Sequence, residues 1–272
     1  LENYAAGVMA KLGLDAATLR ALNPGLVSLS MPAFGSGGPL TGLRAYGSTV
    51  EQASGLPFVN GEAHWPPCLQ HVAYGDPVAG LFGAAAALAG LAGRQTRGGS
   101  DIDLAQVQCL FQLGADAMVA AQVLTELPRT GRRRARLALC TVVACAGTEA
   151  WLTVALKTED LPRLAAIVGS SSADPDAIEA DLAAWAAARS PMDAAARLQD
   201  LGLAAAPVQR ATALCHDEHL LSTGFWPMMT RAYVGDHRAP AAPFRFDGRR
   251  PAMRLPAPLL GEHTDDVVAE LP

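Results

Sequence analysis

The stretch that decides the fold is GDPVAGLFGAAAALAGLAG, residues 75–93. It is apolar with little β-branching, so it predicts a long helix whose first helical residue is Pro77. Asp76 is then predicted to be the N-cap, directed at free backbone N–H groups and ionised at neutral pH. A cap is the better interpretation of Asp76 from local sequence, although a carboxylate at this position could also serve as a nucleophile.

The same apolar run also bears on a membrane location. Residues 78–93 are fewer than the roughly 20 that a spanning helix needs, and Ala and Gly dominate over Leu and Ile. The run therefore predicts a buried helix and no membrane partner.

Residues 1–127, around this helix, have an α/β pattern. A helix is predicted over 15–22 and a buried strand over 26–30, and a second short strand over 101–104 precedes another helix that continues to about residue 123. A further helix is predicted over 49–56. Alternation of this kind is typical of a parallel sheet with helices packed on it.

A second module follows a change of composition. Residues 128–136 carry five arginines and are predicted to form a solvated linker. Residues 137–215 predict a smaller α+β domain with a hairpin over 141–156 and two helices that begin at Asp174-Pro175 and Ser190-Pro191. A helix is also expected over 211–221. Residues 216–272 are rich in proline and are predicted to form a C-terminal segment that packs back on the large domain.

Composition limits the classes of function. The 272 residues are half apolar and carry a net charge of −5, which predicts a globular protein without a nucleic-acid partner. The five cysteines are scattered without a CxxC pair, so reduced thiols and a cytoplasmic location are expected. The histidines form no HExxH pattern, and no metal is predicted. The glycine loop 35–39 lacks the Lys-Ser/Thr of a phosphate-binding P-loop.

Short motifs along almost the whole chain resemble those of one family. They are Asn3-Tyr4, Gly7 through Leu14, Leu22-Asn23-Pro24, Phe34-Gly35 with Gly38-Pro39, Ala45-Tyr46, Gln52-Ala53 with Gly55, Gly75-Asp76 with Ala79-Gly80, Ala206-Pro207-Val208, Gly224-Phe225, and Pro256 through Thr264. In order and spacing this set resembles the class III CoA-transferases, the superfamily of formyl-CoA transferase, carnitine CoA-transferase and α-methylacyl-CoA racemase.

The resemblance implies a role for each site residue. Asp76 matches the family's catalytic aspartate, which forms a mixed anhydride with the acyl group and then an aspartyl-CoA thioester. The family's CoA-binding residues carry over to Asn3, Tyr4, Lys11, Arg44 and Tyr46. Coenzyme A and its acyl thioesters would be substrates, together with carboxylic acids, and no permanently bound cofactor is implied. Family members are interlocked homodimers.

Two departures from the family pattern leave alternatives open. The racemase branch has a histidine where this chain has Tyr46, and a phenol is a poor base at neutral pH. Activity as an acyl-CoA racemase or epimerase is therefore the second hypothesis for the function. The chain also lacks the family's opening strand, loop and helix. We therefore expect an N-terminally incomplete Rossmann-like open sheet domain. The chain would be a fragment, one half of a fused duplicate, or an inactive paralogue, and a non-catalytic CoA-transferase-like half or subunit is the third alternative for its function. Pairing with a separate N-terminal half is the alternative to the homodimer.

Overall fold

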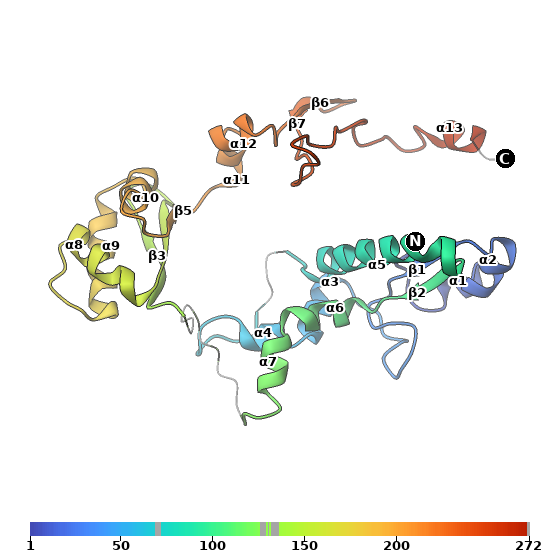
Figure 1. Ribbon diagram of the computed structural model, residues 1–272, viewed down its shortest axis with the longest axis horizontal. Coiled ribbons are helices and arrows are strands. Elements are labelled where there is room, and N and C mark those ends of the chain that lie inside the picture. The colour runs from blue at the N-terminus through green and yellow to red at the C-terminus, as the bar shows by residue number, and fades with distance from the viewer. Residues whose placement is uncertain (69–71, 126–128, 130, 132–135, 271–272) are drawn as a thin grey trace. The chain divides into compact units, whose positions relative to one another are not determined.

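A computed structural model describes the chain except residues 69–71, 126–128, 130, 132–135 and 271–272 (Figure 1). The described residues form two compact units, Leu1–Cys140 and Thr141–Pro272. Most of the predicted linker 128–136 lies outside the described residues. The predicted domain boundaries, and the return of residues 216–272 to the large domain, stay predictions.

The first unit consists of helices around a pair of parallel strands. Its elements are α1 (Val8–Lys11), α2 (Ala16–Leu22), β1 (Val27–Ser30), α3 (Gly47–Ala53), α4 (Leu56–Val59), α5 (Gly75–Arg97), β2 (Ser100–Asp103), α6 (Gln106–Leu113) and α7 (Ala115–Ala120). Strands β1 and β2 pair in parallel, from Val27 opposite Ser100 to Ser30 opposite Asp103. Helix α5, which connects them in sequence, packs on both. The mixed α/β prediction is confirmed, and the Rossmann-like arrangement stays a prediction.

Helix α5 begins earlier than its sequence suggests. Tyr74 is the N-cap and itself has helical backbone angles (φ −55°, ψ −25°), so Gly75 is the first helical residue and Asp76 the second. The prediction that Asp76 caps the helix is therefore wrong. Pro77 is the third residue, a position whose N–H has no partner within the helix, so a proline is accepted there.

Small residues let α5 lie close to the sheet. A Cβ at Gly83 would be 2.8 Å from Met31 Sδ, and a Cβ at Gly90 would be 2.8 Å from Val27 Cγ1. Leu81 and Leu88, in contrast, are mostly exposed. The expectation of a buried helix thus holds for the face on the sheet and fails for the opposite face. Among the described residues α5 is the one helix long and apolar enough to cross a membrane, which is weak evidence because core helices of globular proteins can meet the same criterion.

The beginning of the chain is attached to β1. Glu2 N–H donates to Leu29 O (2.9 Å), and Met31 N–H donates to Glu2 O (3.0 Å). The Ser30 hydroxyl also donates to the Glu2 carboxylate. Asn3 and Tyr4 therefore follow directly from a segment that is fixed beside the strand.

The second unit contains a three-stranded sheet covered by helices. Its elements are β3 (Leu139–Ala144, which begins at the unit boundary), β4 (Trp151–Leu156), η1 (Thr158–Asp160), α8 (Leu161–Val168), α9 (Pro175–Ala187), α10 (Pro191–Gln199), β5 (Ala205–Pro207), α11 (Ala211–Leu214), α12 (Glu218–Ser222), β6 (Met228–Arg231), β7 (Gly235–Arg238) and α13 (Thr264–Ala269). The sheet order is β3-β4-β5, and β4 and β5 are antiparallel. Leu152, Leu164, Leu182 and Leu198 are fully buried. Asp174 and Ser190 cap α9 and α10 through their side chains, as predicted.

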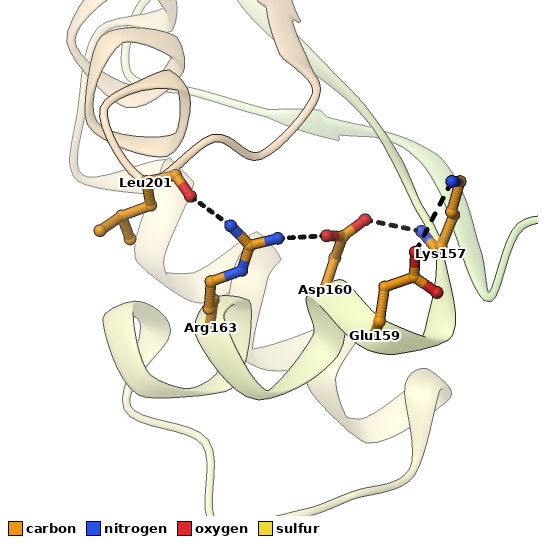
Figure 2. A network of polar contacts seen from close by, with 5 residues as sticks. All are labelled: Lys157, Glu159, Asp160, Arg163 and Leu201. Atoms are coloured by element: carbon orange, nitrogen blue, oxygen red, sulfur yellow. Dashed lines mark hydrogen bonds and ion pairs between the residues drawn. The ribbon is translucent and has the colours of Figure 1, made fainter.

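A polar network joins the start of α8 to the segment after α10 (Figure 2). Arg163 Nη1 donates to Leu201 O (2.7 Å), and its Nη2 pairs with the Asp160 carboxylate. The other Asp160 oxygen accepts from Lys157 N–H (3.0 Å). Lys157 Nζ lies 3.6 Å from the Glu159 carboxylate. Arg163 therefore connects α8 to the turn after α10, where Leu201 is 38 residues away in sequence.

Three predicted helices are interrupted in the structure. The helix predicted over 49–56 is α3 followed by α4, because Gly55 takes a positive φ of 82°. The helix predicted to continue to residue 123 breaks at Gly114 into α6 and α7. The one predicted over 211–221 is α11 and α12, since Asp217 accepts from Leu220 N–H (2.8 Å) and starts a new helix. Local caps and glycine conformation thus override the longer apolar pattern.

Candidate active site

A cavity of about 650 Å³ opens in the first unit where several segments meet. Its wall comes from the chain start, the loop after β1, the loop before α3, and the first residues of α3, α5 and α6. Both strands end near it, since its wall includes the residues after β1 and the start of α6, which follows β2. The carboxyl ends of parallel strands are where open α/β sheets bind ligands.

Asp76 brings a carboxylate to this cavity. Its side chain is exposed, and the residues that the structure describes give it no hydrogen bond or ion pair. Most carboxylates near a helix start bind backbone N–H groups, so a carboxylate without such a partner stays available to a ligand.

Gly47 makes room for that carboxylate. A Cβ at Gly47 would be 2.7 Å from Asp76 Cγ, closer than real Cβ contacts. A Cβ at Gly75 would be 3.0 Å from Gly47 O and 3.3 Å from Val50 Cβ. The first turns of α3 and α5 therefore meet through two glycines, and the approach fixes the position of Asp76 relative to α3.

Four more of the predicted site residues line the same cavity: Asn3, Tyr4, Arg44 and Tyr46. Arg44 is exposed in the loop before α3, and Tyr46 is 86% exposed as the N-cap of that helix. An exposed guanidinium and an exposed phenol supply donors that phosphate or carboxylate groups can use. The structure thus brings Asp76 and these four residues together, although they are up to 73 residues apart in sequence.

Lys11 is the predicted site residue that the structure does not bring to the cavity. It is exposed in the last turn of α1 and is absent from the cavity wall. Its predicted contact with the nucleotide stays a prediction.

Gln106 lines the cavity and was missed in the sequence. It is the first residue of α6, and its Nε2 donates to Met31 O (2.7 Å). That hydrogen bond fixes the side-chain amide between the ends of β1 and β2. The signal that could have found Gln106 is its place just after a predicted strand of a parallel sheet.

The glycine loop 35–39 uses its hydrogen bonds within the protein. Ser36 N–H and its hydroxyl both donate to the Asp103 carboxylate at distances of 3.0–3.2 Å. The Ser36 N–H is therefore directed at a carboxylate of the protein, and the loop glycines are absent from the cavity wall.

The buried thiols lie outside the site. Burial raises the pKa of Cys109 and of Cys145 above the ordinary value, so both stay protonated at neutral pH. All five cysteines are free.

Comparisons with known proteins identify the family of the chain. A family model described as CoA-transferase family III matches residues 1–264. The probable CoA-transferase Rv1866 of Mycobacterium tuberculosis is 29% identical over an alignment of 301 positions. The alignment covers 99% of this chain and 37% of that protein. Succinyl-CoA:glutarate CoA-transferase of Mus musculus is 25% identical, with 100% of this chain and 66% of that protein covered. The chain thus spans between about a third and two thirds of the length of these two relatives.

A solved structure shares the fold. A CAIB/BAIF family protein from Brucella suis superposes with a TM-score of 0.85 at 23% identity, and the match covers 99% of this chain and 74% of that one. At this identity the likeness concerns the fold alone.

Proposed function

The chain belongs to CoA-transferase family III, and on that premise we propose that it transfers coenzyme A between carboxylic acids with Asp76 as the nucleophile. The observation that carries the proposal is the exposed Asp76 carboxylate, which has no described partner and lines a cavity together with Arg44 and Tyr46. A nucleophile must be ionised, reachable and held in place, and the glycine contact between α3 and α5 supplies the third condition.

The proposed reaction runs in four balanced steps. An Asp76 oxygen attacks the thioester carbonyl of the acyl-CoA donor, the C–S bond breaks, and a mixed anhydride forms while CoA leaves as a thiolate. The thiolate then attacks the Asp76 carbonyl of the anhydride, which releases the donor acid as a carboxylate and leaves an aspartyl-CoA thioester.

The acceptor acid repeats these steps in reverse. Its carboxylate attacks the aspartyl thioester, so a second anhydride forms and the CoA thiolate is again released. The thiolate attacks the acceptor carbonyl of that anhydride, and the products are the new acyl-CoA and the free Asp76 carboxylate. No proton and no redox partner is needed.

The polar groups of the wall fit the charges of these substrates. Arg44 can bind a phosphate or carboxylate in bidentate fashion, and Asn3 and Tyr4 offer neutral hydrogen-bonding groups. Gln106 lies where its second amide hydrogen can donate to a substrate oxygen, because the amide has two donors. The names of the relatives suggest succinyl-CoA as donor and glutarate as acceptor for a first assay.

The assembly of the protein is part of the same proposal. Exposed Leu81 and Leu88 on α5 support either the predicted homodimer or pairing with a separate N-terminal half, since large apolar patches are usually covered by another surface. Cytoplasmic location is likewise proposed.

Trapping of the intermediate tests the proposal. The chain is incubated with succinyl-CoA and glutarate and treated with hydroxylamine or borohydride, and the Asp76 peptide is analysed by mass spectrometry. We expect a hydroxamate or a reduced side chain at Asp76, and none in Asp76→Asn. Turnover with an unmodified Asp76 peptide would refute the role of Asp76. Deuterium exchange at the α-carbon of a branched acyl-CoA without CoA transfer would instead support the racemase alternative, and absence of both turnover and CoA binding in calorimetry would support the non-catalytic one.

A further inference from the structure

Glu51 is a buried carboxylate next to the start of α5. Glu51 lies in α3 and is only 2% exposed. Its Oε2 accepts a long hydrogen bond from Tyr74 N–H (3.4 Å). A buried carboxylate requires compensating polar contacts, so its position in the fold is constrained by the groups that it binds.

The first turn of α5 receives no cap from its own side chains. Tyr74, the N-cap, makes no side-chain capping hydrogen bond. Asp76 N–H donates to Ala73 O (3.3 Å), and Pro77 has no N–H. The Glu51 carboxylate, from the neighbouring helix α3, therefore accepts a hydrogen bond from a backbone N–H at the start of α5, as the side chain of a capping residue usually does. Negative charge at a helix N-terminus is also stabilising.

Three residues of α3 face the start of α5. Gly47, Val50 and Glu51 are spaced i, i+3 and i+4, so they share one side of the helix. Gly47 faces the Asp76 carboxylate, Val50 faces Gly75, and Glu51 binds Tyr74. The three contacts follow one another along the chain from Tyr74 to Asp76, so these residues at the start of α5 are held against α3.

We propose that Glu51 is a positioning residue for Asp76: by holding Tyr74 N–H, it fixes the first turn of α5 so that the Asp76 carboxylate stays over Gly47 and faces the cavity. This inference rests on the proposed role of Asp76 as the nucleophile. Attack on a thioester depends on near-attack geometry, so a shift of about 1 Å in this turn would lower the rate while substrate binding at Arg44 and Tyr4 is kept.

Two substitutions of Glu51 separate its hydrogen bond from its volume. Glu51→Leu removes the acceptor and keeps a similar size, and Glu51→Gln keeps an acceptor oxygen without the charge. For Glu51→Leu we expect kcat to fall by about 10- to 100-fold with KM within about twofold of wild type. Glu51→Gln should restore kcat to within about threefold of wild type, because the carboxamide oxygen can still accept from Tyr74 N–H.

Substitutions of Tyr74 test the other partner of this hydrogen bond. Tyr74→Pro removes the N–H donor, and the φ of −55° at this position suits proline. Tyr74→Ala keeps the donor and is the matched control. Tyr74→Pro should lower kcat as Glu51→Leu does, and the two changes together should cost about as much as either alone, because they remove one interaction.

Hydrogen exchange makes the test independent of turnover. Amides of the peptide 72–80 should exchange about tenfold faster in Glu51→Leu than in wild type, as expected for loss of a charge-assisted hydrogen bond, and should be near wild type in Glu51→Gln. Wild-type kcat and unchanged exchange in Glu51→Leu would overturn the inference even if Asp76 is trapped as proposed. If exchange is faster in Glu51→Leu but Asp76 is not trapped in the wild-type chain, the contact of Glu51 with the start of α5 is supported. Only the proposed reaction is then refuted.

Discussion

The Asp76 carboxylate lies against the Cα of Gly47, at a distance that leaves no room for a Cβ on residue 47. This contact joins the second residue of α5 to the first residue of α3. The position of the proposed nucleophile is thus set by the packing of two helix starts, and the absence of a side chain is what permits it.

Gly47→Ala tests this contact. The added methyl group must displace the carboxylate, so we expect kcat to fall by at least about tenfold with a smaller change in KM. Steady-state kinetics with succinyl-CoA would measure the effect. Gly37→Ala is the control, because a Cβ there meets nothing within 4 Å. Equal activity of the two variants would contradict the prediction.

Arg44 and Lys11 are predicted to differ in their effect on substrate binding. Arg44 lines the cavity and Lys11 does not, so Arg44→Ala should raise the KM for the acyl-CoA by about 10-fold or more, as expected for loss of a charge-assisted contact. Lys11→Ala should change it by less than about threefold, as expected for a solvated cation. Calorimetric titration with coenzyme A gives the same comparison without turnover. A larger effect at Lys11 would place part of the nucleotide on α1.

Two glycine substitutions in α5 should act in opposite directions. Gly90→Ala places a Cβ 2.8 Å from Val27 Cγ1, a stiff β-branched side chain, and should destabilise the first unit by about 1–3 kcal/mol. Gly80→Ala meets nothing within 4 Å and should stabilise the helix by about 0.5–1 kcal/mol. Hydrogen exchange of the α5 amides reports on this unit by itself. The same sign for both variants would show that α5 does not rest on β1 as described.

Arg163 is predicted to contribute more to the stability of the second unit than Lys157. Arg163→Ala removes the hydrogen bond to Leu201 O and the pair with Asp160, and should cost about 0.5–1.5 kcal/mol after allowance for solvent screening of the half-exposed guanidinium. Lys157→Ala removes one exposed ion pair and should cost less than about 0.5 kcal/mol. Urea unfolding followed by tryptophan fluorescence in a Trp65→Phe background measures both, since the other tryptophans belong to this unit. Equal costs would mean that the connection to Leu201 adds nothing.

Elements with local signals could be predicted from the sequence. Asp174 and Ser190 each precede a helix and cap it through the side chain, as predicted. The parallel pairing of β1 with β2 follows from the strand, helix, strand order. The cap at Asp76 was predicted by the same logic and is wrong, because the backbone of Tyr74 is already helical and the helix begins at Gly75.

The part of the candidate site that could be predicted from the sequence is the part that resembles the family. The family motifs led to Asp76, Arg44 and Tyr46, and these residues share a cavity. Glu51 and Gly47 could not be found in this way, since their roles arise only where α3 meets α5. Neither residue type nor spacing within α3 indicates which helix lies opposite.

The glycines of α5 have a consequence for how the chain can change. Where Gly83 and Gly90 face β1, the helix contacts the sheet with main-chain atoms, which substitutions elsewhere in α5 do not alter. Exchange of the outer residues Leu81 and Leu88 can therefore adapt that surface to a different neighbour without displacing the helix axis. Substitutions on the outer face of α5 would then leave the position of Asp76, at the start of the same helix, unchanged.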